Sequence, residues 1–138
     1  MRIGELSKEA GCDVETVRYY ERIGLLPEPE RTPSGYRTYG TQHLERLQFI
    51  RHCRTLQMPL AEIGTLLSLQ AQPAQECNEI NDLLDHHIQR IQEQMTSLTT
   101  LKAKLVELRC KCNLPASIRD CAILHDLAHP SARAANQL

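Results

Sequence analysis

Two cysteines near the C-terminal end of the chain have the spacing of a loop that can wrap a metal ion. Cys112 and Cys121 are nine positions apart, and the residues between them include a proline. Thiolates are soft ligands that select soft or borderline ions such as Cd(II), Pb(II), Hg(II), Zn(II) or Cu(I) over hard ones. Two thiolates alone suit a linear monovalent ion, so a divalent ion requires a further ligand.

Cys77 is the candidate for that ligand, but a long helix is predicted between it and Cys112. Residues that are apolar except for His87 and Gln94 recur every three or four positions from Asn78 to Cys112, as on one seam of a helix, and no proline lies between Pro73 and Pro115. The roughly 31 central residues make a rod of ~46 Å, so its ends cannot meet. A single rod cannot bury its seam, so we expect it to pair with the same helix of a second chain. If that pair is antiparallel, Cys77 of one chain arrives beside Cys112 of the other.

The composition favours a helical, cytoplasmic protein. The chain has 138 residues with four Tyr, one Phe and no Trp, so its core must consist mostly of Leu, Ile and Val. It has no signal peptide and no stretch of about 18 apolar residues, which predicts a cytoplasmic location and no membrane partner. Thiols stay reduced there, so the six cysteines indicate metal ligands or core residues before disulfides. No carboxylate pair or activated nucleophile suggests an enzyme.

The N-terminal residues predict a helix-turn-helix followed by a wing. We expect a first helix over Ile3–Gly11, an N-cap at Asp13 and a second helix over Val14–Arg22. The turn residues Pro33-Ser34-Gly35, followed by strand-forming Tyr36-Arg37-Thr38-Tyr39, predict a two-stranded wing.

Further helices are predicted on both sides of the long one. Thr41–Leu56, with Thr41 as its cap, and Leu60–Leu69 should complete a small core with the helix-turn-helix. After the long helix we expect a loop and then a short amphipathic helix over Ile118–Ala128.

Several segments of the chain match the pattern of a known family: Ile3-Gly4-Glu5-Leu6-Ser7, Val14-Glu15-Thr16-Val17-Arg18-Tyr19-Tyr20-Glu21, Gly24-Leu25-Leu26, Gly35-Tyr36-Arg37 and Tyr39. They resemble the DNA-binding domain of the MerR family of transcriptional regulators. The remainder resembles the cadmium- and lead-sensing subgroup of that family, through Arg51-His52-Cys53-Arg54-Thr55-Leu56, Met58-Pro59-Leu60, Cys77 with the following Asn81, Leu83, Leu84 and Asp85, and Val106-Glu107-Leu108-Arg109.

The resemblance implies a homodimer in which an antiparallel coiled coil joins two winged helix-turn-helix domains on a palindromic promoter. In that family the apo form represses, and metal binding distorts the DNA so that RNA polymerase can use the promoter. Three cysteines bind the metal in the subgroup, and the matching positions are Cys77, Cys112 and Cys121. Three thiolates carry a charge of −3, so a divalent ion leaves a net charge closer to zero than a monovalent ion does. We therefore expect Cd(II) or Pb(II), with Hg(II) or Zn(II) as alternatives, rather than copper.

The predicted fold class is mainly α, and the chain divides into four predicted parts. These are a winged helix-turn-helix DNA-binding domain (1–75), a dimerisation helix (76–112), a metal-binding loop and short helix (113–129) and a disordered tail (130–138).

The basic residues fit a DNA-binding domain. From residue 16 to residue 54 there are seven Arg against four Glu, an excess that alone is ordinary for a solvated face. Together with the helix-turn-helix and the wing, it predicts a surface for double-stranded promoter DNA. We assign to this surface Thr16, Arg18, Tyr19, Arg31, Tyr36 and Arg37. Most should contact phosphate, while Thr16 and Arg18 are the candidates for base edges.

A second metal site is a further hypothesis. It would be harder in character and formed by Glu62, Asn81, His86 and His87, and the alternative interpretation is that these histidines are solvated at the surface.

The other cysteines have separate interpretations. Cys110 lies two positions before Cys112 at a helix end, so its thiol points to another side and we interpret it as an outer thiol. Cys12 and Cys53 are interpreted as packing residues. The alternative functions are a Hg(II)- or Zn(II)-responsive regulator of the same family, or a regulator that senses oxidation of its thiols.

Overall fold

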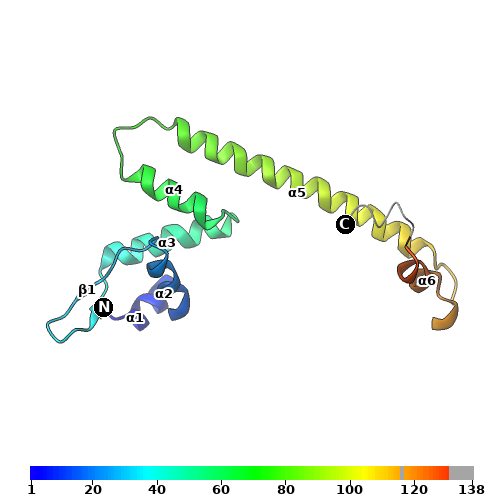
Figure 1. Ribbon diagram of the computed structural model, residues 1–138, viewed down its shortest axis with the longest axis horizontal. Coiled ribbons are helices and arrows are strands. Elements are labelled where there is room, and N and C mark those ends of the chain that lie inside the picture. Colours follow the sequence, from blue (N-terminus) through cyan, green and yellow to red (C-terminus); the bar gives the residue numbers. More distant parts are fainter. Residues whose placement is uncertain (116, 131–138) are drawn as a thin grey trace. The chain divides into compact units, whose positions relative to one another are not determined.

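The chain folds mainly as helices (Figure 1). The computed structural model describes residues 1–115 and 117–130. The elements are α1 (Ile3–Ala10), α2 (Val14–Arg22), β1 (Glu30–Arg31), β2 (Arg37–Thr38), α3 (Thr41–Thr55), α4 (Leu60–Gln70), α5 (Asn78–Cys110), the 3-10 turn η1 (Ile118–Asp120) and α6 (Ala122–Ala128). They belong to two compact units, Met1–Asp85 and a second that starts at His86.

The turn between α1 and α2 depends on a glycine and on an arginine from α3. Gly11 has φ 72°, a left-handed backbone conformation that ends α1 and that residues other than glycine rarely adopt. Arg51 of α3 donates from Nη1 to the carbonyl oxygen of Ala10 at 2.8 Å. The predicted helix-turn-helix is confirmed, with α2 at its predicted limits and α1 one residue shorter than expected.

The start of α3 differs from the prediction. Gly40, not Thr41, occupies the N-cap position. The backbone N–H of Gly40 donates to Nδ1 of His43 at 3.0 Å, and the N–H of His43 donates to the oxygen of Gly40 at 3.0 Å. The buried His43 also places Nε2 3.2 Å from the oxygen of Pro27. Because this ring provides the reciprocal bond of a capping box, no threonine cap is needed.

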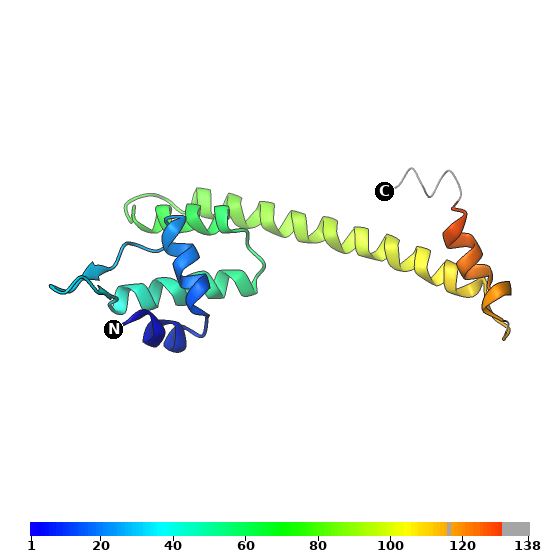
Figure 2. The same cartoon turned by 60° about the horizontal axis from the view of Figure 1, so that its bottom comes forward.

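The wing is a short hairpin. β1 pairs antiparallel with β2, with Glu30 opposite Thr38 and Arg31 opposite Arg37. Its tip is closed by Gly35, at φ 88°, whose N–H donates to the oxygen of Thr32 at 2.8 Å. Figure 2 shows the hairpin projecting from the group formed by α1, α2 and α3.

Two apolar clusters form the core of the first unit. The first contains Leu6, Ala10, Val17, Leu26, Tyr39 and Leu47, and the second contains Leu25, Ile50, Cys53, Met58, Ile63 and Leu67. Tyr20 of α2 packs against both clusters. Leu83, near the start of α5, packs against the second, so the first turns of the long helix belong to the same core as the helix-turn-helix.

The C-terminal segment is more divided than predicted. The expected single helix over Ile118–Ala128 is wrong, because η1 ends at Asp120 and α6 begins at Ala122. Cys121 lies between them with extended backbone, φ −71° and ψ 113°. Ser117 Oγ donates to Asp120 Oδ2 at 3.1 Å, a local side-chain bond of the kind that competes with regular helix. The predicted disordered tail, except for Pro130, lies outside the described residues.

The long helix is continuous, as the sequence predicts, and ends at Cys110, two residues earlier than expected. Asn113 Nδ2 donates to the oxygen of Cys110 at 2.7 Å, and Arg109 Nη1 donates to the oxygen of Cys112 at 2.7 Å. The first bond satisfies the carbonyl of the last helical residue, and the second links the helix end to the residue that carries the next thiol. In the part of the chain that the structure describes, no helix is long and apolar enough to cross a membrane.

Candidate DNA-binding surface and metal-ligand cysteines

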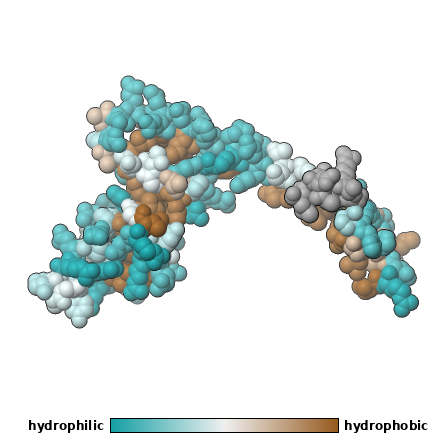
Figure 3. All heavy atoms as spheres, viewed as in Figure 1, coloured by the Kyte–Doolittle hydropathy of each residue, from teal (hydrophilic) through white to brown (hydrophobic). Residues whose placement is uncertain are grey.

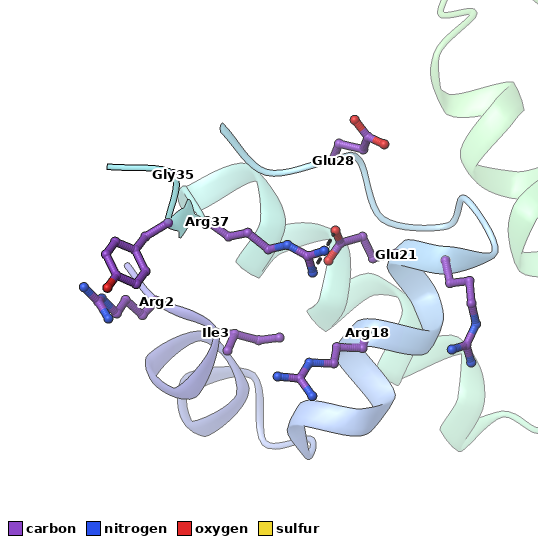
Figure 4. A pocket seen from close by; sticks show the side chains of 9 residues that line it. Arg2, Ile3, Arg18, Glu21, Glu28, Gly35 and Arg37 are labelled. Atoms are coloured by element: carbon purple, nitrogen blue, oxygen red, sulfur yellow. Dashed lines mark ion pairs between the residues drawn. The ribbon is translucent and has the colours of Figure 1, made fainter. Parts of the chain in front are cut away.

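Arginine side chains surround a shallow hollow between α2, the wing and the residues that begin α1. The hollow has a volume of about 790 Å³. It is lined by Arg2, Ile3, Arg18, Glu21, Arg22, Glu28, Gly35, Tyr36 and Arg37. Figure 4 shows Arg18 of α2 and Arg37 of the wing projecting from different elements toward this space. Four arginines against two glutamates make it a cationic surface, which suits a phosphate backbone.

Glu21 ties the wing to α2 beneath this surface. Its Oε1 lies 3.4 Å from Arg37 Nη1, drawn as a dashed line in Figure 4, and its Oε2 accepts the hydroxyl of Tyr39 at 3.0 Å. The phenol pKa of Tyr39 is raised by burial and by this hydrogen bond to a carboxylate. The wing arginine is therefore held at a fixed place relative to α2.

Two arginines stack on tyrosine rings at the same surface. The guanidinium carbon of Arg2 lies 4.5 Å from the centroid of the Tyr36 ring, and that of Arg22 lies 5.4 Å from the centroid of Tyr19. Such stacking orients a guanidinium while leaving its N–H groups available for phosphate. Arg2 was missed from the sequence, where its only signal was a basic residue directly before the first helix.

The other predicted DNA-binding residues have partners within their own segments. Thr16 Oγ1 donates to Asp13 Oδ1 at 2.7 Å, which lowers the pKa of that carboxyl group. Arg18 Nη1 lies 3.5 Å from Glu15 Oε1. Arg31 Nη1 donates to the oxygen of Gly35 at 3.0 Å. Arg31 therefore stabilises the hairpin tip, whatever else it contacts.

The six cysteines, all in the described part of the chain, are free thiols of two kinds. Cys53 is buried in the second core cluster, and Cys12 packs against the first. Burial raises the pKa of both thiols, and a neighbouring Asp13 raises that of Cys12 further. These two are therefore structural thiols rather than metal ligands.

The remaining four cysteines lie at the two ends of α5, and the exposed Cys110 is its last residue. Cys77 is exposed and directly precedes the helix, while Cys112 and Cys121 are partly exposed and follow it. The Cys112 thiol lies 3.7 Å from the oxygen of Leu114. With 33 residues in α5, the two ends of the helix are roughly 50 Å apart. Within one chain, Cys77 is therefore remote from the other two.

The chain matches two family models. Residues 1–70 match the model described as MerR HTH family regulatory protein, and residues 44–108 match the model described as MerR, DNA binding. The chain belongs to the MerR family. It is a DNA-binding transcriptional regulator and not an enzyme.

Curated MerR-family relatives align over most of their length. The chain is 48% identical over 111 residues to the HTH-type transcriptional regulator ZntR homolog of Haemophilus influenzae, covering 80% of this chain and 82% of that protein. It is 39% identical over 126 residues to the mercuric resistance operon regulatory protein of Bacillus cereus, covering 91% and 96%.

Solved MerR-family structures agree with the fold. A transcription regulator of Ralstonia metallidurans in complex with lead(II) superimposes with a TM-score of 0.83 at 48% identity, covering 92% of this chain and 98% of that one. The MerR of Bacillus megaterium in complex with mercury(II) gives a TM-score of 0.70 at 34% identity, covering 93% and 99%.

The hypothetical harder site stays a prediction. Glu62 lies on α4, whereas Asn81, His86 and His87 lie on α5. His87 is buried, and its Nδ1 is 3.0 Å from Arg90 Nη2. Among the described residues of a single chain, no three His, Cys, Asp or Glu side chains are grouped so as to hold a metal ion.

Proposed function

We propose that this MerR-family chain works as a homodimer that binds one soft divalent ion between Cys77 of one subunit and Cys112 and Cys121 of the other. The position of these thiols carries the proposal. Cys77 flanks one end of α5 and the other two flank the opposite end, so an antiparallel pair of helices brings all three together twice per dimer.

Exposed apolar side chains along α5 support the pairing. Leu84, Ile88, Ile91, Met95, Leu98, Leu101 and Leu105 are all exposed to solvent in the single chain, Leu98 and Leu105 by 64% each. Figure 3 shows apolar residues, coloured brown, at the surface of α5 and of the segment after it. Their spacing of three and four residues is that of a coiled-coil seam. A second α5 is the partner whose seam has the same pattern.

The donor set fits Cd(II) or Pb(II). Three thiolates and no hard oxygen ligand favour a soft ion, and both ions accept three sulfurs. The lead(II)-bound relative at 48% identity supports this choice. Hg(II) is the alternative, supported by the mercury(II)-bound relative at 34% identity. The position of the ligand-to-metal charge-transfer band in a metal titration distinguishes the two.

The cationic surface connects metal binding to the promoter, because it holds the DNA. In the proposed mechanism the dimer stays on a palindromic promoter, with Arg2, Arg22 and Arg37 on phosphates and Arg18 at a base edge, and represses without metal. Metal binding favours a second arrangement of the dimer that bends and undertwists the DNA for RNA polymerase. The metal must bind the second arrangement more tightly than the first by enough to offset a DNA deformation cost of a few kcal/mol.

Mixed dimers test the shared site. Neither Cys77→Ser nor Cys112→Ser homodimers should bind Cd(II) tightly, because each lacks one thiolate at both sites. A heterodimer of the two variants should regain one site, which a charge-transfer titration counts as about half the wild-type stoichiometry. Cys12→Ser is the control and should bind as the wild type does.

Tight Cd(II) binding by either variant alone would refute ligation across the dimer. A chain that binds none of these ions but loses two hydrogens in mass under mild peroxide would instead favour the thiol-oxidation alternative, in which Cys110 and Cys112 are the nearest pair in sequence.

A further inference from the structure

His125 lies in α6, and His129 follows the helix as its C-cap residue. Their N–H groups donate to the oxygens of the residues four positions earlier, His125 to Cys121 at 3.1 Å and His129 to His125 at 3.0 Å. The two residues are therefore one turn apart, and although His129 has left helical backbone, its ring lies against that of His125. Both are exposed to solvent.

The separation of the two rings matches that of a chelating pair. Their centroids are 4.9 Å apart and their planes are inclined by 50°. An ion bound about 2 Å from a ring nitrogen lies about 3.2 Å from the ring centroid, so two rings that share a tetrahedral ion have centroids roughly 5 Å apart. Histidines at positions i and i+4 of a helix are a recurrent metal-binding arrangement for the same reason.

An ion pair joins α6, the helix that precedes His129, to the residue directly after α5. Lys111 Nζ lies 2.8 Å from Asp126 Oδ1, which joins α6 to the residue that follows the long helix. The carboxylate nearest to the imidazoles in sequence is thereby engaged, so the donors offered to an ion are the two ring nitrogens. Neutral imidazole suits borderline cations such as Zn(II), Ni(II) and Cu(II), rather than the softest ions.

We propose that His125 and His129 bind one borderline divalent cation, represented by Zn(II), through their two ring nitrogens, with water completing the coordination. This site is separate from the three-thiolate site and does not depend on it. It follows Cys121, a thiol that the proposed function assigns to the inducing metal, and the two segments are joined by the backbone bond from His125 to Cys121.

The test uses the full chain with the proposed thiolate ligands replaced. In a Cys77→Ser, Cys112→Ser, Cys121→Ser background, Zn(II) is titrated against a chromophoric chelator. We expect about one Zn(II) per chain, and His125→Gln or His129→Gln should each weaken binding roughly tenfold or more, because a chelate becomes a single ligand. His52→Gln, on the exposed side of α3, is the matched control and should leave the affinity unchanged.

Nitrogen NMR of the imidazoles provides the second readout. Zn(II) should shift the ring-nitrogen resonances of His125 and His129 together and leave those of His52 in place. Equal Zn(II) affinity in the background and in the His125→Gln variant, or an equal loss in His52→Gln, would overturn the proposal. So would titration of the two rings at different Zn(II) concentrations.

Discussion

Gly11 determines where α1 stops and how α2 leaves it. Its positive φ costs a side-chain-bearing residue about 1 kcal/mol or more. Space is a separate constraint, because a Cβ at this position would collide with the guanidinium of Arg51. That guanidinium would have to leave the Ala10 carbonyl that it now bonds.

Gly11→Ala should therefore destabilise the protein by about 2 kcal/mol, from left-handed strain plus the lost Arg51 bond. Urea unfolding followed by circular dichroism measures this. Gly4→Ala is the matched control, since Gly4 lies inside α1 with no atom within 4 Å of the added methyl. It should be neutral or stabilising by up to about 1 kcal/mol. An equal loss in both variants would contradict the role given to Arg51.

Tyr39 gives a pH dependence whose sign follows from its raised pKa. The fold favours the neutral phenol, so this contribution to stability is complete below the ordinary tyrosine pKa of about 10 and is lost as the pH rises through the higher folded value. Tyr39→Phe should cost about 1 kcal/mol at neutral pH by removing the bond to Glu21. It should also lose less stability than the wild type above pH ~10. Urea unfolding across that range tests both points, and Tyr36→Phe, at an exposed ring, should change neither.

At the scale of elements, α6 is attached to the end of α5 by the ion pair between Lys111 and Asp126. Surface pairs of this kind contribute little to overall stability. This one spans the loop between Cys112 and Cys121, so its effect should fall on the position of the second thiol.

Reversing either charge should weaken Cd(II) binding about two- to fivefold, equivalent to roughly 0.5–1 kcal/mol. Lys111→Asp with Asp126→Lys should restore it, because the pair is re-formed with opposite polarity. Chelator competition measures the affinity, and thermal unfolding should show nearly unchanged stability. If the loss of Cd(II) binding free energy in the double variant equals the sum of the losses in the two single variants, the ion pair does not position the loop.

Sequence patterns predicted the elements whose signals are local and strong. Asp13 occupies the predicted N-cap position of α2, without a capping bond from its side chain to the backbone, and α5 follows a long uninterrupted seam; the limits of both helices match within two residues. The errors arose where a local hydrogen bond that the sequence pattern does not reveal set the limit of an element. His43 rather than Thr41 completes the cap of α3, and a bond between Ser117 and Asp120 accompanies the break before Cys121.

In the candidate sites too, some residues could be assigned from the sequence and others only from contacts between segments. Residues of α2 and the wing could be assigned from their spacing, but Arg2 joins them only because its guanidinium stacks on Tyr36 from another segment. The three-cysteine site remains a prediction from spacing and resemblance, since the proposed ligands come from two chains and the structure describes one.

For the whole molecule, the exposed seam of α5 should decide the assembly. Leu98→Asp places a charge in the centre of that seam and should convert the dimer to a monomer, with loss of operator binding, because each domain alone contacts one half-site. Light scattering after size exclusion gives the mass, and a gel shift gives the binding. Thr100→Asp, rotated by about 200° on the same helix, should remain dimeric. A dimeric Leu98→Asp variant would exclude this seam as the interface.

Tyr20 packs against both core clusters, which has a consequence for how movement is transmitted. One cluster holds α1 and α2 in place, and the other has Leu83 from the start of α5 packed against it. A shift of the long helix that displaces Leu83 must therefore be accommodated in the packing around a residue of α2 itself. Close-packed side chains transmit displacement instead of absorbing it. We infer that a change in the packing at the start of α5 can reach α2 through the second cluster and Tyr20, without any change of charge at the candidate DNA-binding surface.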